Sequence, residues 1–153
     1  MKLMPKIYEF KTSVRWKNSR RGELLSKGRE KIEVGCPTEF GGDPDCWTPE
    51  HLFVASIETC VMTTFLWMID KLGGKILNYE SDSSGKAYMQ GSEFKFNEVT
   101  VKPMILVQDK EDFLKAQRAI EYAKRECLIT KALNIKVNVE PRIELKAAIG
   151  CDG

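Results

Sequence analysis

Histidine is almost absent from this sequence, and its cysteines form no closely spaced pair. His51 is the only histidine among 153 residues, and the five cysteines are unevenly spaced with no C-x-x-C motif. A structural zinc site needs about four nitrogen or sulfur ligands, usually in closely spaced pairs. We therefore expect no metal, and we expect His51 to be a surface or interface residue rather than a ligand or a general base.

A strong excess of charge of either sign is also missing. The formal net charge is +2, which gives no electrostatic basis for a nucleic-acid or membrane partner. Residues 1–16 contain no apolar core followed by a small-residue cleavage site. The longest apolar stretch carries Glu50, Glu58 and Asp70, which argues against a membrane span. These absences together predict a cytoplasmic protein without a secretory signal.

Internal repeats, low-complexity segments and a composition shift that would mark a second domain are absent as well. Apolar residues make up 42% of the chain and charged residues 30%, a balance typical of soluble globular proteins. A chain of this length can bury a substantial core as one domain. We therefore expect a single domain over residues 1–153, in which 148–153, including Cys151, form a loose tail.

The most prominent feature that is present is an apolar stretch over residues 47–72. Thr48 is a good N-cap and Pro49 fits the first turn of a helix, while Gly73 and Gly74 favour its end. Apolar residues recur in adjacent pairs every four residues, so they form one wide face of an amphipathic helix. This face comprises Leu52, Phe53, Ser56, Ile57, Cys60, Val61, Thr64, Phe65, Met68, Ile69 and Leu72, with Cys60 in its middle.

Alternating or β-branched segments before and after this helix predict strands. The expected strands are residues 6–17, 23–26, 31–34, 75–90, 92–107 and 134–147, and the two longest are joined by a hairpin turn at 90–92. Pro103 and Pro141 each indicate an edge position or a bulge.

A second helix is expected from Asp109 or Asp112 to about Cys127. Its apolar stripe consists of Phe113, Ala116, Ile120, Ala123 and Cys127. The resulting order of elements lacks the strict alternation of a doubly wound fold. It predicts an α+β protein in which helices pack on a mainly antiparallel sheet.

Two cysteines occupy equivalent places, because Cys60 and Cys127 each lie on the apolar stripe of a helix. If both stripes face one core, the two thiols can meet. Such a pair suits peroxide reduction, in which one thiolate is oxidised to a sulfenic acid and the other thiol resolves it as a disulfide. The alternative is that both are inert core thiols, since free cysteine is among the most buried residue types.

A peroxidatic thiol needs a lowered pKa and hence a nearby cation. Arg20 and Arg21, in the first turn, are the candidates, and Glu50 can orient a guanidinium through a bidentate pair. Glu50 and Cys60 are ten residues apart on one helix, or about 15 Å along its axis. If both belong to one site, Glu50 is expected to come from a neighbouring subunit.

The run from Thr48 to Cys60, T-P-E-H-L-F-V-A-S-I-E-T-C, resembles the helix signature of the OsmC/Ohr family, which begins N-P-E-x-L-x-x-A and closes with a cysteine. These are the osmotically inducible protein C and organic hydroperoxide resistance proteins. The preceding Phe40-Gly41-Gly42, the order of elements and the position of Cys127 also resemble the family. The resemblance implies a β-β-β-α-β-β-α-β fold and an intertwined homodimer with two shared sites at the subunit interface.

The same resemblance implies a thiol peroxidase that reduces organic hydroperoxides to alcohols without metal, haem or flavin and is recycled by a dithiol reductant. By the family's pattern Cys60 is the peroxidatic thiol and Cys127 the resolving thiol. Arg20 or Arg21 supplies the guanidinium, and Glu50 is its carboxylate partner. Apolar side chains around Cys60 are then expected to form the pocket for the substrate.

The chain departs from the family's pattern at two places. The family's peroxidases often carry G-C-P at the resolving cysteine, where this chain has Glu126-Cys127-Leu128, and the arginine of the first turn is doubled. A non-catalytic dimer that binds a hydrophobic small molecule at the interface is therefore the alternative function. A structural protein whose thiols only fill space is a third. The additional Cys36 and Cys46 flank the loop before the central helix. A bridge between them or a relay of oxidation is the alternative, and we expect no special role for either.

Overall fold

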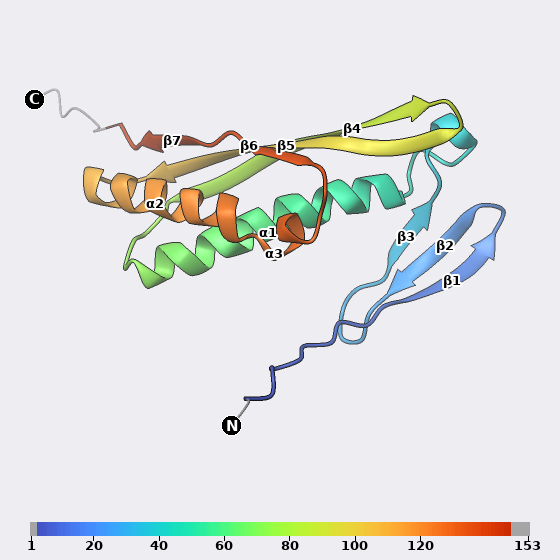
Figure 1. Cartoon of the computed structure of the whole chain (residues 1–153), viewed down its shortest axis with the longest axis horizontal. Helices are drawn as coiled ribbons and strands as arrows, with labels where there is room; N and C mark the ends of the chain where they lie inside the picture. The colour runs from blue at the N-terminus through green and yellow to red at the C-terminus, as the bar shows by residue number, and fades with distance from the viewer. Residues whose placement is uncertain (1–2, 148–153) are drawn as a thin grey trace, which may run out of the picture. The chain divides into compact units, whose positions relative to one another are not determined.

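The computed structural model describes residues 3–147 and contains two compact units, Met1–Leu52 and Phe53–Gly153 (Figure 1). The expected loose tail at 148–153, with Cys151, lies outside the described residues. The structure confirms a mixed α+β fold. Its elements follow the predicted order except that the closing strand is divided in two and a short third helix precedes it.

The N-terminal unit is a three-stranded antiparallel sheet. Its strands β1 (Ser13–Asn18), β2 (Arg21–Leu25) and β3 (Ile32–Gly35) lie in the order in which they follow along the chain. The prediction of a strand from residue 6 is wrong, because the pairing with β2 begins at the Ser13–Leu25 pair. Residues 6–12 thus have no facing strand with which to pair. After β3 comes the short 3-10 helix η1 (Thr38–Phe40).

This unit buries almost no apolar side chain of its own. Every residue of β1 is exposed, including Val14 at 68% and Trp16 at 77%. Among the described residues, the buried core cluster begins at Ile57, with Phe53 and Val54 packed against it. A sheet of this size gains independent stability by packing its apolar face. The exposed side chains of β1 contribute little to such packing among the described residues.

Helix α1 (Pro49–Lys71) confirms the predicted central helix and both of its end signals. The Thr48 hydroxyl accepts a hydrogen bond from the His51 N–H at 3.1 Å, so Thr48 caps the helix as expected. Gly73 ends it with a φ of 68°, a left-handed conformation that glycine adopts without strain. His51 is exposed, and its Nδ1 lies 2.6 Å from the same hydroxyl.

Only one line of α1 is fully buried. Ile57, Val61, Phe65 and Ile69 recur every four residues against the core, which is narrower than the predicted face. The mean hydropathy of an 18-residue window in α1 is 1.7, and 22% of that window is buried. By length and composition α1 would pass as a membrane span, a test that the core helix of a soluble protein also passes. Most of this window is therefore not buried among the described residues.

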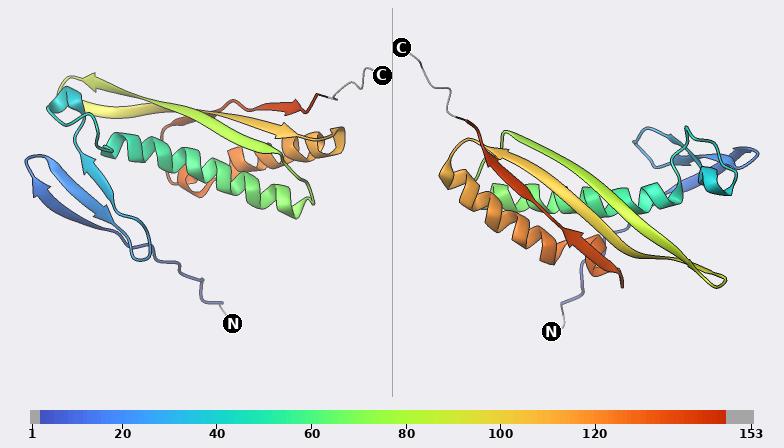
Figure 2. Two further views of the ribbon diagram at one scale, coloured as in Figure 1. Left: turned by 180° about the vertical axis from the view of Figure 1, so that it is seen from behind. Right: turned by 90° about the horizontal axis from the view of Figure 1, so that it is seen from above.

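The C-terminal unit places helices on one face of a four-stranded sheet (Figures 1 and 2). The hairpin of β4 (Asn78–Gln90) and β5 (Glu93–Val107) turns at Gly91 and Ser92 as predicted. Helix α2 (Lys110–Glu126) starts at Asp109, whose side chain accepts from the Asp112 N–H. The four-residue α3 (Leu128–Lys131) follows directly.

The expected closing strand consists of two short strands, β6 (Lys136–Val139) and β7 (Arg142–Leu145). Both pair with β5 in parallel, because the chain crosses the sheet through α2 before it returns. Pro141 lies in the break between them.

The prediction that Pro103 marks an edge or bulge is wrong, since β5 is the central strand. Pro103 faces the break instead, between the residues that pair with β6 and those that pair with β7.

The core of this unit includes most of the predicted stripe of α2 and the central line of the predicted face of α1. Strand β5 contributes four inward-facing residues to this core, Val99, Val101, Ile105 and Val107. Helix α2 contributes Ala116, Ala119, Ile120 and Ala123. The three alanines on α2 allow that helix to approach the sheet closely. Cys127, at the end of the same stripe, is fully buried in this core.

Candidate active site

The structure brings the thiols of Cys60 and Cys127 together, as expected if both stripes face one core. Cys60 is half-buried near the middle of α1, and Cys127 is completely buried where α2 ends. Both are free thiols. Their side chains are joined by a hydrogen bond, in which the Cys127 thiol donates to the Cys60 sulfur.

Several donors converge on the Cys60 sulfur. Burial alone raises the pKa of this thiol, but the hydrogen bonds to its thiolate outweigh burial and hold the pKa below its ordinary value. The donors are the Cys127 thiol, the backbone N–H groups of Ile129 and Leu128, and the Thr64 hydroxyl, whose oxygen lies 3.9 Å from the sulfur. The thiolate of Cys60 is therefore more stable than that of an ordinary cysteine.

Cys127 shows the opposite shift. Burial raises the pKa of its thiol, and the hydrogen bond to Cys60 and the negative charge there raise it further. The pKa values of the two thiols are thus shifted in opposite directions, so Cys60 is the more readily ionised thiol of the pair.

The backbone donors arise at the point where the chain departs from the G-C-P pattern. Cys127 is the N-cap of α3 and Leu128 is its first residue. The first N–H groups of a helix have no partner within the helix, so those of Leu128 and Ile129 are free to reach the Cys60 sulfur. A proline at position 128 has no N–H to donate.

Replacing Leu128 by proline is therefore expected to raise the pKa of Cys60. Proline is well tolerated at the first position of a helix, so the fold should persist. The measurement is the rate of iodoacetamide labelling of the Cys60 peptide against pH, quantified by mass spectrometry. The curve should move to higher pH in Leu128→Pro and stay in place in Leu128→Ala, which keeps the N–H. Identical curves for the two variants would contradict this role of the Leu128 N–H.

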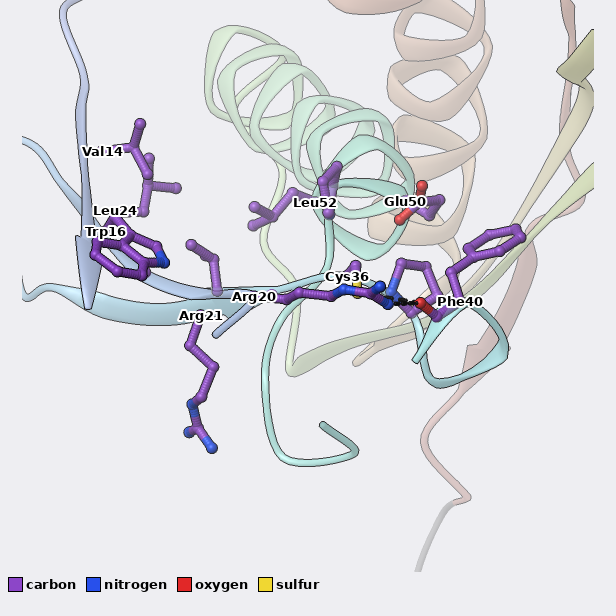
Figure 3. A pocket seen from close by; sticks show the side chains of 14 residues that line it. Val14, Trp16, Arg20, Arg21, Leu24, Cys36, Phe40, Glu50 and Leu52 are labelled. Atoms are coloured by element: carbon purple, nitrogen blue, oxygen red, sulfur yellow. Dashed lines mark hydrogen bonds between the residues drawn. The ribbon is translucent and has the colours of Figure 1, made fainter. Parts of the chain in front are cut away.

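The three remaining candidate residues lie in the N-terminal unit, at a cavity of about 660 Å³ (Figure 3). Its walls are mostly apolar, and the residues with polar side chains among its lining include Arg20, Arg21, Cys36 and Glu50. The apolar part of the lining comprises Val14, Trp16, Leu24, Val34, Pro37, Phe40, Pro49 and Leu52. We expected an apolar pocket around Cys60, but the lining of this cavity does not include that residue.

The two arginines point in different directions (Figure 3). The Arg20 guanidinium donates to the Phe40 carbonyl oxygen. Gly41 is needed at this contact, since its φ is 85° and an added Cβ would lie 2.5 Å from the Arg20 Nη1. Arg20 thus remains at the cavity without an acidic partner among the described residues.

Arg21 is held by acidic side chains instead. Its guanidinium lies 3.1 Å from Asp43, 3.4 Å from Asp45 and 3.8 Å from Glu33. Asp43, Asp45 and Cys46 also place possible ligand atoms within 4.8 Å of one another, but the Arg21 cation already occupies the vicinity of both aspartates. Arg21 therefore ties the loop that leads into α1 to strand β2.

Glu50 has an unused carboxylate oxygen. It lines the cavity from the first turn of α1, and its Oε2 is buried without a hydrogen-bond partner. A buried carboxylate oxygen without a donor is costly. Among the described residues no ion pair joins it to Arg20, so the expected pair is not formed within the single chain. No side chain or backbone group among the described residues satisfies this oxygen.

Sequence reasoning missed two features of these sites. Cys36 lines the same cavity as Arg20 and Glu50, and the backbone of α3 donates to Cys60. The acidic residues of the sequence D-P-D at 43–45 were a signal that one of the two arginines would be engaged by them. No pattern in the sequence predicted the short helix α3.

The fold and the paired thiols define a class of α+β proteins with a cysteine at the middle of a long helix and a second cysteine beside it. A family model described as OsmC-like protein matches residues 42–142, and the chain belongs to the OsmC family. No curated protein matches its sequence.

Solved structures share the fold at low sequence identity. An OsmC-like protein of unknown function from Vibrio cholerae is 19% identical with a TM-score of 0.80, over 89% of this chain and 100% of that one. An organic hydroperoxide resistance protein from Legionella pneumophila is 19% identical with a TM-score of 0.69, over 92% and 100%. The organic hydroperoxide resistance protein OhrB of Bacillus subtilis is 22% identical with a TM-score of 0.61, over 90% and 98%.

Proposed function

We propose that this protein is a two-cysteine thiol peroxidase that reduces organic hydroperoxides to alcohols. The observation that carries the proposal is the Cys60–Cys127 pair, in which the pKa of one thiol is lowered and that of the other raised. Inert core thiols need no such convergence of donors on one sulfur. The names of the Legionella and Bacillus structures, both organic hydroperoxide resistance proteins, agree with this chemistry.

In the first step the Cys60 thiolate attacks the outer oxygen of the hydroperoxide. The O–O bond breaks, the alkoxide takes a proton from solvent and leaves as the alcohol, and Cys60 becomes a sulfenic acid. The hydroperoxide gains the two electrons that the sulfur loses. The negative charge of Cys60, which helped to raise the pKa of Cys127, disappears in this step.

In the second step the Cys127 sulfur attacks the sulfur of Cys60. The S–O bond breaks, and the departing hydroxide takes the thiol proton to form water, which leaves a Cys60–Cys127 disulfide. A dithiol reductant then restores both thiols by disulfide exchange. Neither step uses a metal or an organic cofactor.

The function includes a homodimer with shared sites. Glu50 lies ten residues before Cys60 on α1, a separation of about 15 Å along the helix, so the cavity with Glu50 and Arg20 serves the thiol pair of the partner subunit. The buried Oε2 of Glu50 without a donor, the exposed β1 and the uncovered surface of α1 support such a partner. Hydrophobic surface of this extent is typical of an interface.

The substrate is an apolar hydroperoxide. The cavity that holds Arg20 has few polar side chains, and Arg20 has no acidic partner among the described residues. A guanidinium in apolar surroundings stabilises negative charge that develops on the peroxide oxygens. An alkyl or lipid-like tail then lies against side chains such as Trp16 and Leu24.

The experiment is a titration of the reduced protein with one equivalent of cumene hydroperoxide in the absence of other thiols. We expect one equivalent of the alcohol and a single Cys60–Cys127 disulfide in the peptide map. If both thiols still react with iodoacetamide and no alcohol forms, the peroxidase is excluded.

The apolar cavity also favours the alternative, a dimer that binds a hydrophobic small molecule without chemistry. A binding protein of this kind should give a different result in the same titration. The unchanged hydroperoxide should stay with the protein on a desalting column, and all thiols should remain reduced. Alcohol formation distinguishes the two functions directly.

A further inference from the structure

A third thiol, Cys36, lies at the cavity and has no part in the two-cysteine reaction. It follows β3 directly, is half-buried and lines the cavity together with Arg20 and Glu50 (Figure 3). It is a free thiol. The position differs from that of Cys46, which is buried beside Asp45 and is not part of the lining.

Cys36 is fixed next to the Arg20 guanidinium. Its Sγ lies 3.8 Å from the Phe40 carbonyl oxygen, and this is the oxygen to which Arg20 donates. The loop is closed tightly over it, because an added Cβ at Gly42 would overlap the Cys36 carbonyl and lie 3.0 Å from Sγ. One carbonyl oxygen therefore holds a thiol and a cation side by side at the cavity.

This juxtaposition has a consequence that rests on the proposed function. If Arg20 stabilises the peroxide during attack, the sulfur that attacks it reaches the same end of the cavity. The Cys60 of the same chain is about 15 Å from Glu50 along α1, so the attacking sulfur belongs to the partner subunit. We propose that Cys36 is a second resolving thiol, which captures the sulfenic acid on Cys60 of the partner subunit and links the two chains.

The reaction balances without a further reagent. The Cys36 sulfur attacks the sulfur of the sulfenic acid, the S–O bond breaks, and the hydroxide leaves as water with the proton of the Cys36 thiol. The product is a disulfide between two chains. In the native protein Cys127 is hydrogen-bonded to Cys60 and reacts first, so Cys36 acts when Cys127 is absent or already blocked.

The test uses full-length protein that carries Cys127→Ser and Cys151→Ser. After one equivalent of cumene hydroperoxide, non-reducing electrophoresis should show a band at twice the 17.4 kDa chain mass, and the peptide map should contain Cys36 bonded to Cys60. Adding Cys36→Ser should abolish this band. Adding Cys46→Ser, the matched control, should leave it unchanged.

Dimedone labelling distinguishes failure of this inference from failure of the proposed function. If Cys60 is labelled as a sulfenic acid but no Cys36–Cys60 disulfide forms, the peroxidase stands and the role of Cys36 is wrong. If Cys60 is neither labelled nor cross-linked, both are overturned. A cross-linked band that survives Cys36→Ser also overturns the inference.

Discussion

Replacing Cys60 by serine is expected to lower the rate of cumene hydroperoxide reduction by about a thousandfold or more, as is common when a nucleophile is removed. Serine has nearly the same shape as cysteine. Its hydroxyl is not ionised near neutral pH, and a hydroperoxide does not oxidise it as it oxidises a thiolate to a sulfenic acid. The donors around Cys60, from Cys127, Thr64 and the start of α3, then have no anion to stabilise. The measurement is hydroperoxide consumption in the presence of dithiothreitol.

Cys127→Ser is the informative companion to this variant. It keeps the nucleophile, so it should still consume one equivalent of hydroperoxide in a single rapid turnover. It cannot form the Cys60–Cys127 disulfide, and further turnover then depends on direct attack by dithiothreitol on the sulfenic acid. Cys46→Ser, at a buried thiol outside both sites, should retain the full rate. Equal losses in Cys60→Ser and Cys46→Ser would contradict a specific role for Cys60.

The placement of Cys60 and Cys127 on the core-facing sides of their helices could be predicted from the sequence, because it depends on helical periodicity. Each cysteine extends an apolar stripe whose other members must be buried, and in a chain with one core the two stripes face the same interior. The caps at Thr48 and Asp109 were predictable for the same reason, since a cap depends on residues within one turn. The faces of the cysteines and the caps are local features, and the structure confirms them, whereas the contact between the two thiols also depends on how the helices pack.

Other features depend on contacts between distant segments. The four residues of α3 are too few to show a periodicity, and they become helical where the chain leaves the core at Cys127. The parallel pairing of β6 and β7 follows from the path of the chain through α2. The prediction for Pro103 was wrong because this proline lies in the central strand, opposite the break between β6 and β7. That break is formed by a segment far away in the sequence.

The choice between the two arginines is another case that sequence could not decide. The pairing of β1 with β2 shifts between Trp16 and Asn18, and Ser19 in the turn has a φ of 47°. A shift of one residue exchanges the faces of all side chains that follow. Which guanidinium pairs with acidic side chains is therefore set by an irregular turn. The result is Arg20 at the Phe40 carbonyl and Arg21 among the acidic residues.

Arg20→Met is expected to lower kcat/KM for cumene hydroperoxide by about 100-fold to 1,000-fold, the range found when one preorganised donor to a developing negative charge is lost. Methionine preserves much of the length and the apolar contacts of the side chain, so the change isolates the guanidinium. Arg20→Lys keeps a positive charge but not the planar set of donors. Its rate should lie between those of the native protein and Arg20→Met.

Arg21→Met provides the contrast, because the two residues are adjacent and equal in charge. It removes the ion pairs with Asp43, Asp45 and Glu33, which are partly exposed and individually contribute at most about 1 kcal/mol. We expect a modest loss of stability in urea and a loss of kcat/KM well below that of Arg20→Met. A larger kinetic effect at Arg21 than at Arg20 would show that the family's arginine is Arg21. The proposed role of Arg20 at the cavity in Figure 3 would then be wrong.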